Sequence, residues 1–312
     1  MMISGRLASG QHQSGMAIVL AMLVLALAAI AASGFVFRAA MEWRKFENAS
    51  SLGQARWVLR AAEKWAGAVL RDDARQSSVD HRGELWAREL PAVDSEGYAL
   101  SGRVEDMDGR FNLNNLIREG VTDPAQLALF RRLLGALDVP EALAEDIADW
   151  LDADNRVSGS DNAETALYAA QSPILAPANR PLASPDELIR VRGMNRALLD
   201  RLRPYIAVLP GFNGINVNTA SAETLAALVD GLTLEQAYTL AARRDRVYFR
   251  DIEDFRQALP PGLSPLAGMG LTTSRYFLVL ARARHDRVNV GSRALLSRDT
   301  NGTTALIWRA SL

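Results

Sequence analysis

An uninterrupted apolar segment near the N-terminus is the strongest feature of the hydropathy pattern. It extends from Met16 to Phe37 without a charged residue, and a run of about 20 apolar residues is long enough to cross a bilayer as a helix. Basic residues flank it on both sides, so charge favours a cytoplasmic N-terminus only weakly. We predict one membrane-spanning helix; the alternative is a cleaved signal peptide with a small-residue site near Ala31-Ala32-Ser33.

The pattern beyond this segment is that of an amphipathic helix. Apolar residues recur at steps of three and four from Leu52 to Val69, which places them on one helical face. Three further apolar residues widen that face: Val58, Ala61 and Trp65. No proline occurs before residue 71, so the pattern predicts one helix over about 16–71, about 80 Å long at about 1.5 Å per residue. This continuity argues against a signal peptide and predicts that the second half packs on a globular head.

Strand patterns lie on both sides of a long helical block. Residues 98–104 alternate between apolar and polar, as a half-buried strand does. The apolar run 276–281 predicts a central strand, and Asn301-Gly302 predicts a hairpin turn between two further strands. We expect the last strands to pair with the strand near Tyr98. The predicted fold class is therefore α+β, with a long N-terminal helix and a large all-α domain inserted into the head.

Two segments of the helical block, at about 184–206 and 215–256, are similar to helix-hairpin-helix units. A hairpin that binds DNA needs a second backbone donor, usually from a Gly-apolar-Gly turn, together with nearby cations. The turns here are Gly193-Met194-Asn195 and Gly231-Leu232-Thr233, and Glu235 would repel phosphate. We therefore favour structural hairpins. The alternative is a membrane-anchored DNA-uptake protein that binds nucleic acid through these units.

Composition narrows the function classes. The 312 residues include 35 basic and 36 acidic side chains and no cysteine. This balance disfavours a nucleic-acid partner, and the absence of cysteine excludes a thiol nucleophile and a thiolate zinc site. The sequence has no nucleophile elbow, P-loop, His-Glu-x-x-His or Rossmann glycine motif. We expect no enzymatic activity, although a hydrolase with two distant carboxylates stays open.

Acidic residues crowd the segment 146–164. A calcium ion would relieve their mutual repulsion, and a ligand set of oxygens alone favours calcium over zinc. The spacing is not that of an EF-hand, because Arg156 and Ala163 occupy ligand positions when Asp152 is counted as the first. The alternative is a solvated acidic loop with Arg156 as partial counterion. The candidate ligands are Asp149, Asp152, Asp154, Asp161 and Glu164.

A second, weaker candidate for calcium is the turn Asp106-Met107-Asp108-Gly109. Turns of this composition more often only connect two elements.

The N-terminal segment resembles the leader of type IV pilin-like proteins. Gln13-Ser14-Gly15 followed by Met16 is similar to the site that prepilin peptidase cleaves after glycine. Pilins usually have a glutamate five residues into the mature chain, where this sequence has Leu20. The missing glutamate, the DWLDAD run, the INVNTAS segment and the strand-rich end occur in an order that resembles the GspK family, the large minor pseudopilins of type II secretion. The resemblance covers essentially the whole chain.

This resemblance implies a division of the chain and a set of partners. The segments are a leader (1–15), a transmembrane half-helix (16–37), its periplasmic continuation with the first strand (38–105), an inserted helical domain (106–272) and C-terminal strands (273–312). It implies cleavage after Gly15, methylation of Met16, and an inner-membrane protein with a cytoplasmic N-terminus and a periplasmic head. It also implies a tip position in the pseudopilus and a structural Ca2+. The expected partners are the minor pseudopilins I, J and H, the major pseudopilin, prepilin peptidase, inner-membrane lipid and secreted substrates.

Overall fold

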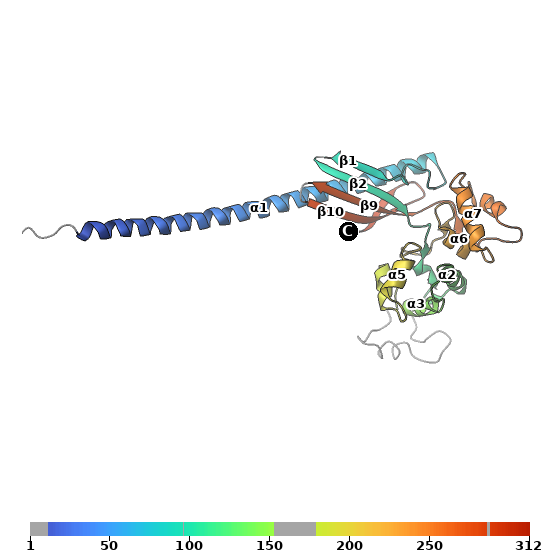
Figure 1. Cartoon of the computed structure of the whole chain (residues 1–312). Coiled ribbons are helices and arrows are strands. Elements are labelled where there is room, and N and C mark those ends of the chain that lie inside the picture. Colours follow the sequence, from blue (N-terminus) through green and yellow to red (C-terminus); the bar gives the residue numbers. More distant parts are fainter. Residues whose placement is uncertain (1–11, 96, 153–178, 286–287) are drawn as a thin grey trace, which may run out of the picture.

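The computed structural model describes residues 12–95, 97–152, 179–285 and 288–312. Figure 1 shows a helix that extends far from a head made of a sheet and a cluster of short helices. The helix, α1 (His12–Gln76), is continuous over 65 residues, which confirms the predicted single helix. All of its described side chains from residue 15 to residue 50 are exposed, and its first half is long and apolar enough to span a membrane.

The head is one antiparallel sheet packed against the second half of α1. Its strand order is β1-β2-β9-β10-β11, so β9 is central, as predicted. The strands are β1 (Leu90–Ser95), β2 (Tyr98–Asp106), β9 (Tyr276–His285), β10 (Val288–Arg298) and β11 (Thr304–Ser311). β2 pairs with β9 along their length, which confirms the expected pairing between strands on either side of the helical block.

One face of α1 packs on this sheet. Ala55, Leu59 and Leu70 are buried against apolar residues of β2, β9 and β10. The buried Glu63 accepts hydrogen bonds from Arg309 Nε at 2.7 and 2.9 Å and from Ser292 Oγ at 3.2 Å. These hydrogen bonds connect the helix to both β10, through Ser292, and β11, through Arg309.

Two residues expected to widen the buried face of α1 do not do so. Ala61 is exposed and Trp65 is 52% exposed. The sheet contacts only one side of the helix. Ala61 and Trp65 lie beside that side rather than within it. The prediction for Ala61 and Trp65 was therefore wrong, whereas Val58 is buried as expected.

The helical domain is inserted between β2 and β9 and has its own core. Asp123 caps the N-terminus of α2, where Pro124 is the first helical residue. Phe111 and Phe130 stack with ring centroids 5.0 Å apart at the centre of the core. In chain order the elements are β3 (Phe111–Asn112), η1 (Leu113–Leu116), β4 (Ile117–Arg118), β5 (Val121–Thr122), α2 (Pro124–Ala136), α3 (Leu143–Leu151), η2 (Pro185–Arg190), α5 (Arg196–Leu202), β6 (Ile206–Ala207), β7 (Ile215–Asn216), α6 (Ala222–Leu228), α7 (Leu234–Arg244), α8 (Ile252–Ala258) and β8 (Gly270–Leu271).

The two hairpin segments differ in their first element. In the second, α6 and α7 are joined by a turn in which Gly231 has a φ of +79°, a left-handed conformation that favours glycine. In the first, the element before Gly193 is the six-residue 3-10 helix η2, whose N-terminus is capped by a capping box from Ser184 and Glu187. The prediction of two full helices was thus correct for the second hairpin and wrong for the first.

Truncating Leu70 tests the contact between helix and sheet. The side chain is fully buried, so Leu70→Ala should lower the free energy of unfolding of the head by about 2–5 kcal/mol. Arg71→Ala, at the neighbouring exposed position, should change it by less than about 0.5 kcal/mol. Urea unfolding of the full chain in detergent micelles, followed by near-UV circular dichroism, measures both. Equal midpoints for the two variants would refute this packing.

Candidate functional site

The junction between head and helical domain is built around two carboxylates. β2 ends at Asp106 and β9 begins at Tyr276, so the chain enters and leaves the helical domain at adjacent points of the sheet. Asp108 accepts hydrogen bonds from the backbone N–H of Arg275 at 2.5 Å and of Tyr276 at 2.8 Å. It also accepts one from Asn213 Nδ2 at 2.6 Å. The turn after β2 is thereby fastened to the start of β9.

Asp106 has a similar set of donors. Its carboxylate accepts from Ser274 Oγ at 2.6 Å, from Thr219 Oγ1 at 2.5 Å and from Asn216 Nδ2 at 3.1 Å. A Cβ on Gly109 would lie 2.6 Å from Thr219 Oγ1, so only glycine allows this close approach. The Asp-x-Asp-Gly turn is therefore a hydrogen-bonded connection whose carboxylates are occupied by protein donors, and it does not offer them to calcium.

The role of the INVNTAS segment in this junction was not predicted from the sequence. Asn216 and Thr219 serve the junction, and Asn216 Nδ2 also donates to the carbonyl of Asp80 at 3.0 Å. Asn218 exchanges hydrogen bonds with the backbone of Phe249 at 2.8 Å each. Two asparagines separated by one valine and followed by threonine, in an otherwise apolar stretch, were the available signal, because buried polar side chains need partners.

A buried arginine closes the junction against the end of α1. Arg298 donates to Asp73 at 3.0 Å and to the carbonyl of Leu70 at 3.1 Å, and it forms an ion pair with Asp80. Oxygens of Asp73, Asp80 and Glu84 lie within 4.8 Å of one another. Because Arg298 already bonds two of these carboxylates, the group is an ion-pair cluster rather than a vacant metal site.

Burial raises the pKa values of several of these carboxyl groups. Burial, with the charge of Asp106 as a second cause, raises the pKa of Asp108 to about 7. Burial also raises the pKa of Asp106. The pKa of Asp73 rises to about 6 through burial and the charges of Glu84 and Asp80. The junction therefore takes up protons in a pH range where ordinary carboxyl groups are ionised.

Two of the five predicted calcium ligands lie together at the end of α3. Asp149 is 4% exposed and Asp152, which ends the helix, is 6% exposed. Two buried carboxylates at the negative end of a helix dipole fit a cation with oxygen ligands. Asp146, the acidic residue one turn earlier, accepts a hydrogen bond from Arg192 Nε at 3.0 Å. The other three candidates, Asp154, Asp161 and Glu164, lie outside the described residues.

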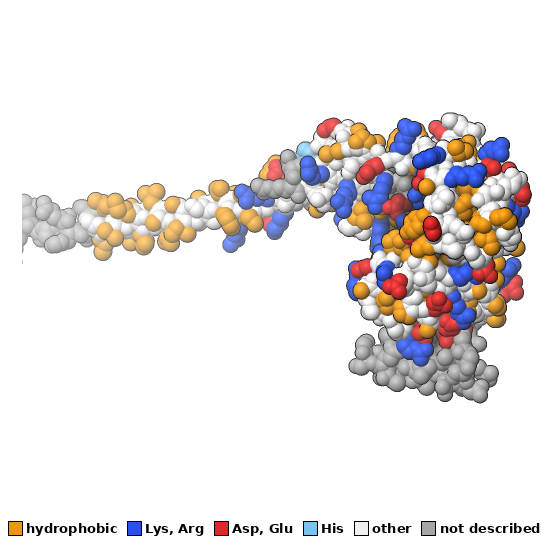
Figure 2. Space-filling model, turned by 45° about the vertical axis from the view of Figure 1, so that its right-hand side comes forward, with side chains coloured by type: hydrophobic (Ala, Val, Ile, Leu, Met, Phe, Trp, Pro, Cys, Tyr) orange, Lys and Arg blue, Asp and Glu red, His pale blue; other side chains and the backbone are white. Residues whose placement is uncertain are grey.

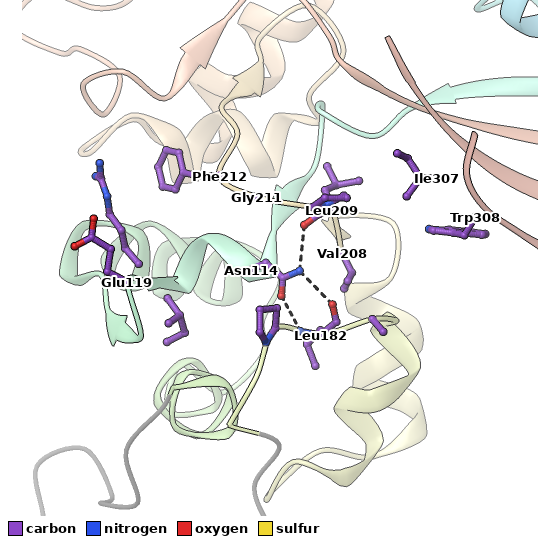
Figure 3. A pocket seen from close by; sticks show the side chains of 14 residues that line it. Asn114, Glu119, Leu182, Val208, Leu209, Gly211, Phe212, Ile307 and Trp308 are labelled. Carbon is purple, nitrogen blue, oxygen red and sulfur yellow. Dashed lines mark hydrogen bonds between the residues drawn. The ribbon is translucent and has the colours of Figure 1, made fainter. Parts of the chain in front are cut away.

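A crevice separates the helical domain from the edge strand β11 (Figure 3). Its volume is about 650 Å³, and Phe212, Ile307 and Trp308 contribute to its lining. Asn114 connects two of its walls, because its Nδ2 donates to the carbonyls of Leu182 and Leu209 at 3.2 and 3.1 Å. The side chain of Asn114 at the centre of the crevice thus fixes the backbone at Leu182 and Leu209.

One basic side chain that the DNA-uptake alternative could use, Arg244, has partners inside the protein, whereas Arg243 is exposed. Arg244 is buried and donates to the carbonyls of Val217 and Ala220 at 2.9 and 2.6 Å. Arg196 forms an ion pair with Asp200 at 3.2 Å. Arg244 therefore positions the INVNTAS loop and is not available to a phosphate.

Comparison with known proteins identifies the family. The model of the first domain of type II secretion system protein K matches residues 109–211, and the model of type II secretion system protein K matches residues 215–272. Type II secretion system protein K of Pseudomonas aeruginosa is 34% identical over 293 residues, covering 90% of this chain and 86% of the relative. The chain belongs to the type II secretion system protein K family.

Further comparisons agree with this family. Protein K of Aeromonas hydrophila is 31% identical over 280 residues, covering 84% of this chain and 85% of the relative. The crystal structure of the GspK–GspI–GspJ complex of enterotoxigenic Escherichia coli has a chain that matches with a TM-score of 0.69 at 21% identity. The match covers 86% of this chain and 99% of that one, which confirms the α+β fold.

Family membership confirms the predicted function class. The chain is a minor pseudopilin of type II secretion, a structural component of the secretion system, and the DNA-uptake alternative is not favoured. For a protein K of this kind, the hydrogen-bonded junction serves to hold the helical domain in position on the head.

The protonation of Asp108 gives the junction a pH dependence. The unfolded chain releases this proton near pH 4, whereas the folded chain holds it until about pH 7. Ionisation therefore lowers the free energy of unfolding as pH rises through this interval. Asp108→Asn cannot ionise, so its free energy of unfolding does not include this loss. From pH 4 to pH 7, the free energy of unfolding of the variant minus that of the wild type should therefore increase by about 1–3 kcal/mol.

Urea unfolding of both proteins at several pH values measures this difference. Asp230→Asn is the matched control, because its side chain is 86% exposed, and its stability should follow the wild type at every pH. A difference between Asp108→Asn and the wild type that stays constant with pH would contradict the assignment.

Proposed function

We propose that this chain caps the pseudopilus of type II secretion, with α1 anchored in the inner membrane and the head in the periplasm. The observation that carries the proposal is the position of the helical domain. Its junction with the head includes Asp73 near the end of α1 and Arg298 at the end of β10. This junction lies at the end of the head that is farthest from the apolar half of the helix (Figure 1). A bulky domain there would prevent another subunit from stacking above.

The apolar half of α1 supports the same position. Leu20 occupies the place where pilins usually have a glutamate, and it is exposed together with its neighbours. A carboxylate at this depth of the bilayer is costly unless a neighbouring subunit provides a counter-charge. A terminal subunit has no subunit above it to provide that charge, so leucine is the less costly residue.

The proposed partners are other subunits of the same assembly. The structurally similar GspK is crystallised in a complex with GspI and GspJ, and we extend this to the minor pseudopilins I, J and H and the major pseudopilin. Inner-membrane lipid surrounds the apolar half of α1, prepilin peptidase removes residues 1–15, and the new N-terminal Met16 is methylated. Secreted proteins are further partners of the exposed helical domain.

Substitution of Gly15 tests the pathway. Gly15→Val should block cleavage, because prepilin-type processing sites require glycine before the cut, so the mature mass should be lost and secretion should fall at least about tenfold. Gly34→Val is the matched control. Both glycines lie in α1, and a Cβ at either position would have no atom within 4 Å. Intact mass of the membrane protein and secreted activity are the measurements. Normal cleavage and secretion in Gly15→Val would overturn the proposal.

We also propose that Ca2+ stabilises the helical domain through Asp149, Asp152, Asp154, Asp161 and Glu164. The support is the burial of Asp149 and Asp152 together at the end of α3. Free Ca2+ at about 100 times its Kd should add about 2.7 kcal/mol to the free energy of unfolding, and the Tm should rise accordingly. Mg2+ should do much less, because it requires tighter octahedral geometry.

Neutral variants test this ligand set. Asp149→Asn and Asp152→Asn should each remove most of the Ca2+-dependent rise in Tm, while Asp230→Asn, at an exposed position, should keep it. Thermal unfolding in EDTA, Ca2+ and Mg2+ is the measurement. An unchanged rise in both ligand variants would exclude this site.

A further inference from the structure

The sheet of the head has two edge strands, β1 and β11, and only β1 is protected against pairing with another chain. β1 contains Pro91 and Asp94, and its register with β2 shifts after Leu90; these features prevent edge pairing in many proteins. β11 contains no proline, lysine or acidic residue, and no other described strand pairs with its outer side. Its single charged side chain, Arg309, is bound to Glu63 of α1. β11 therefore presents unpaired main-chain groups along an edge without free charge.

The exposed side chains of β11 are apolar and lie beside the crevice. Leu306 and Ile307 are 46% and 42% exposed. The register with β10 shifts between Leu306 and Trp308, so that Ile307 is an extra residue, and such a bulge re-aims a side chain. As a result, the consecutive residues Ile307 and Trp308 both line the crevice (Figure 3). An extended segment laid along β11 would have this apolar depression beside it.

The opposite wall of the crevice is formed before any ligand binds. Phe212 is 50% exposed, and the guanidinium of Arg118 lies over its ring, 5.5 Å from the centroid. The hydroxyl of Tyr276 donates to the carbonyl of Pro210 at 3.0 Å, which fixes the adjoining backbone to the start of β9. A fixed apolar wall reduces the entropy lost on binding, so the crevice can take apolar side chains without rearrangement.

Charge does not select the ligand of this surface. Figure 2 shows basic and acidic side chains interspersed over the head and the helical domain, and the crevice is lined mainly by apolar residues. On an unpaired strand edge, main-chain hydrogen bonds supply the affinity, and pockets for alternate side chains supply the specificity. The combination of a free edge and an apolar crevice therefore fits an extended peptide.

We propose that β11 pairs with an extended segment of a secreted protein, which adds a sixth strand to the five-stranded sheet and places apolar side chains in the crevice. The inference rests on the proposed function, because that function brings secreted proteins to this chain. Pairing through the main chain tolerates different side chains, as a surface that receives more than one secreted protein requires.

The size of the surface favours a transient partner over a permanent subunit. β11 has eight residues and is about 26 Å long, with about 4.8 Å between paired strands. This edge and the crevice offer much less than the roughly 800 Å² per partner that stable complexes bury. A contact of this size suits a protein that binds and is then released.

A second copy of this chain is disfavoured by its direction. Antiparallel strand pairs are the more common kind, and α1 extends in the general direction of the strands (Figure 1). Antiparallel pairing of β11 with its own copy would point the two α1 helices in opposite directions, whereas the proposed function requires both to enter one membrane.

Photocrosslinking in cells tests this assignment. The probe p-benzoylphenylalanine is encoded at Ala305 of the full chain, an exposed residue of β11, in cells that contain the whole secretion system and export one known enzyme. The matched control has the same probe at Ala92, an exposed residue of β1. The probe at Ala305 should crosslink to the exported enzyme at least about tenfold more than the probe at Ala92, because only Ala305 lies within the contact.

Paired lysine substitutions test the edge itself. Ile307→Lys places a charge at the crevice, so it should reduce both the crosslinked product and the export of the enzyme about tenfold. Val93→Lys on β1 is the matched control, because Val93 is 41% exposed and Ile307 is 42% exposed. This control should stay within about twofold of the wild type, and near-UV circular dichroism of both variants should match that of the wild type.

Hydrogen exchange of the wild type distinguishes strand addition from side-chain packing alone. The N–H of Leu312 donates to the carbonyl of Gly291 at 3.0 Å, so the N–H of Ser311 points to the free edge, because successive backbone groups of a strand alternate in direction. When the exported enzyme is added in excess to the full chain in detergent micelles, the outward amides of β11 should exchange at least about tenfold more slowly, and those of β1 should not change. Ser311→Pro removes one outward donor and should weaken the crosslink about threefold.

The possible results separate this assignment from the proposed function. Crosslinks from Ala305 to another subunit, to a second copy of this chain or to lipid would overturn the assignment. A yield equal to that at Ala92, or unchanged exchange in β11, would overturn it as well. If the assignment fails while Gly15→Val still abolishes processing and secretion, the proposed function stands without it. If Gly15→Val has no effect, the proposed function fails first.

Discussion

The placement of the helical domain depends on keeping two carboxylates satisfied, that of the buried Asp108 and that of the partly buried Asp106. Asp106 and Asp108 are surrounded by donors from three separate parts of the chain, at residues 213–219, at residues 274–276 and within their own turn. A buried carboxylate without donors costs several kcal/mol. Any movement of the domain that breaks one of these hydrogen bonds leaves an acceptor unsatisfied, so the network selects one orientation. Apolar contacts alone, being non-directional, would permit several.

The long helix poses a different physical problem, because it must satisfy lipid at one end and a sheet at the other. Small apolar residues such as Ala55 and Ala66 bring α1 close to the sheet, and Leu59 and Leu70 provide the larger apolar contacts. The buried hydrogen bonds of Glu63 with Arg309 and Ser292 add a directional contact. Together these contacts fix the rotation of α1 about its axis.

The sequence predicted the elements that local pattern controls and missed those that distant contacts control. The span of α1 and the central position of β9 follow from helical periodicity and from an apolar run. β1 was missed because Pro91 and Asp94 give it no strand pattern. The pair of Arg298 with Asp80 spans 218 positions, and nothing near either residue indicates the other. For Asp149 and Asp152, the density of acidic residues in the sequence suggested a cation site, but only the fold shows that both side chains are buried.

The point of insertion explains how one pilin-like head accommodates so large an addition. β2 and β9 are antiparallel neighbours, paired up to Asp106 and Phe277, and two such strands need a connection of only about two residues. Whatever replaces that turn leaves the register of the sheet unchanged, because the register is set by the strand pairs themselves. The polar network then has a separate task. It joins the turn after β2 to the start of β9, and it determines where the inserted domain points. For the capping role that we propose, that direction is the property on which function depends.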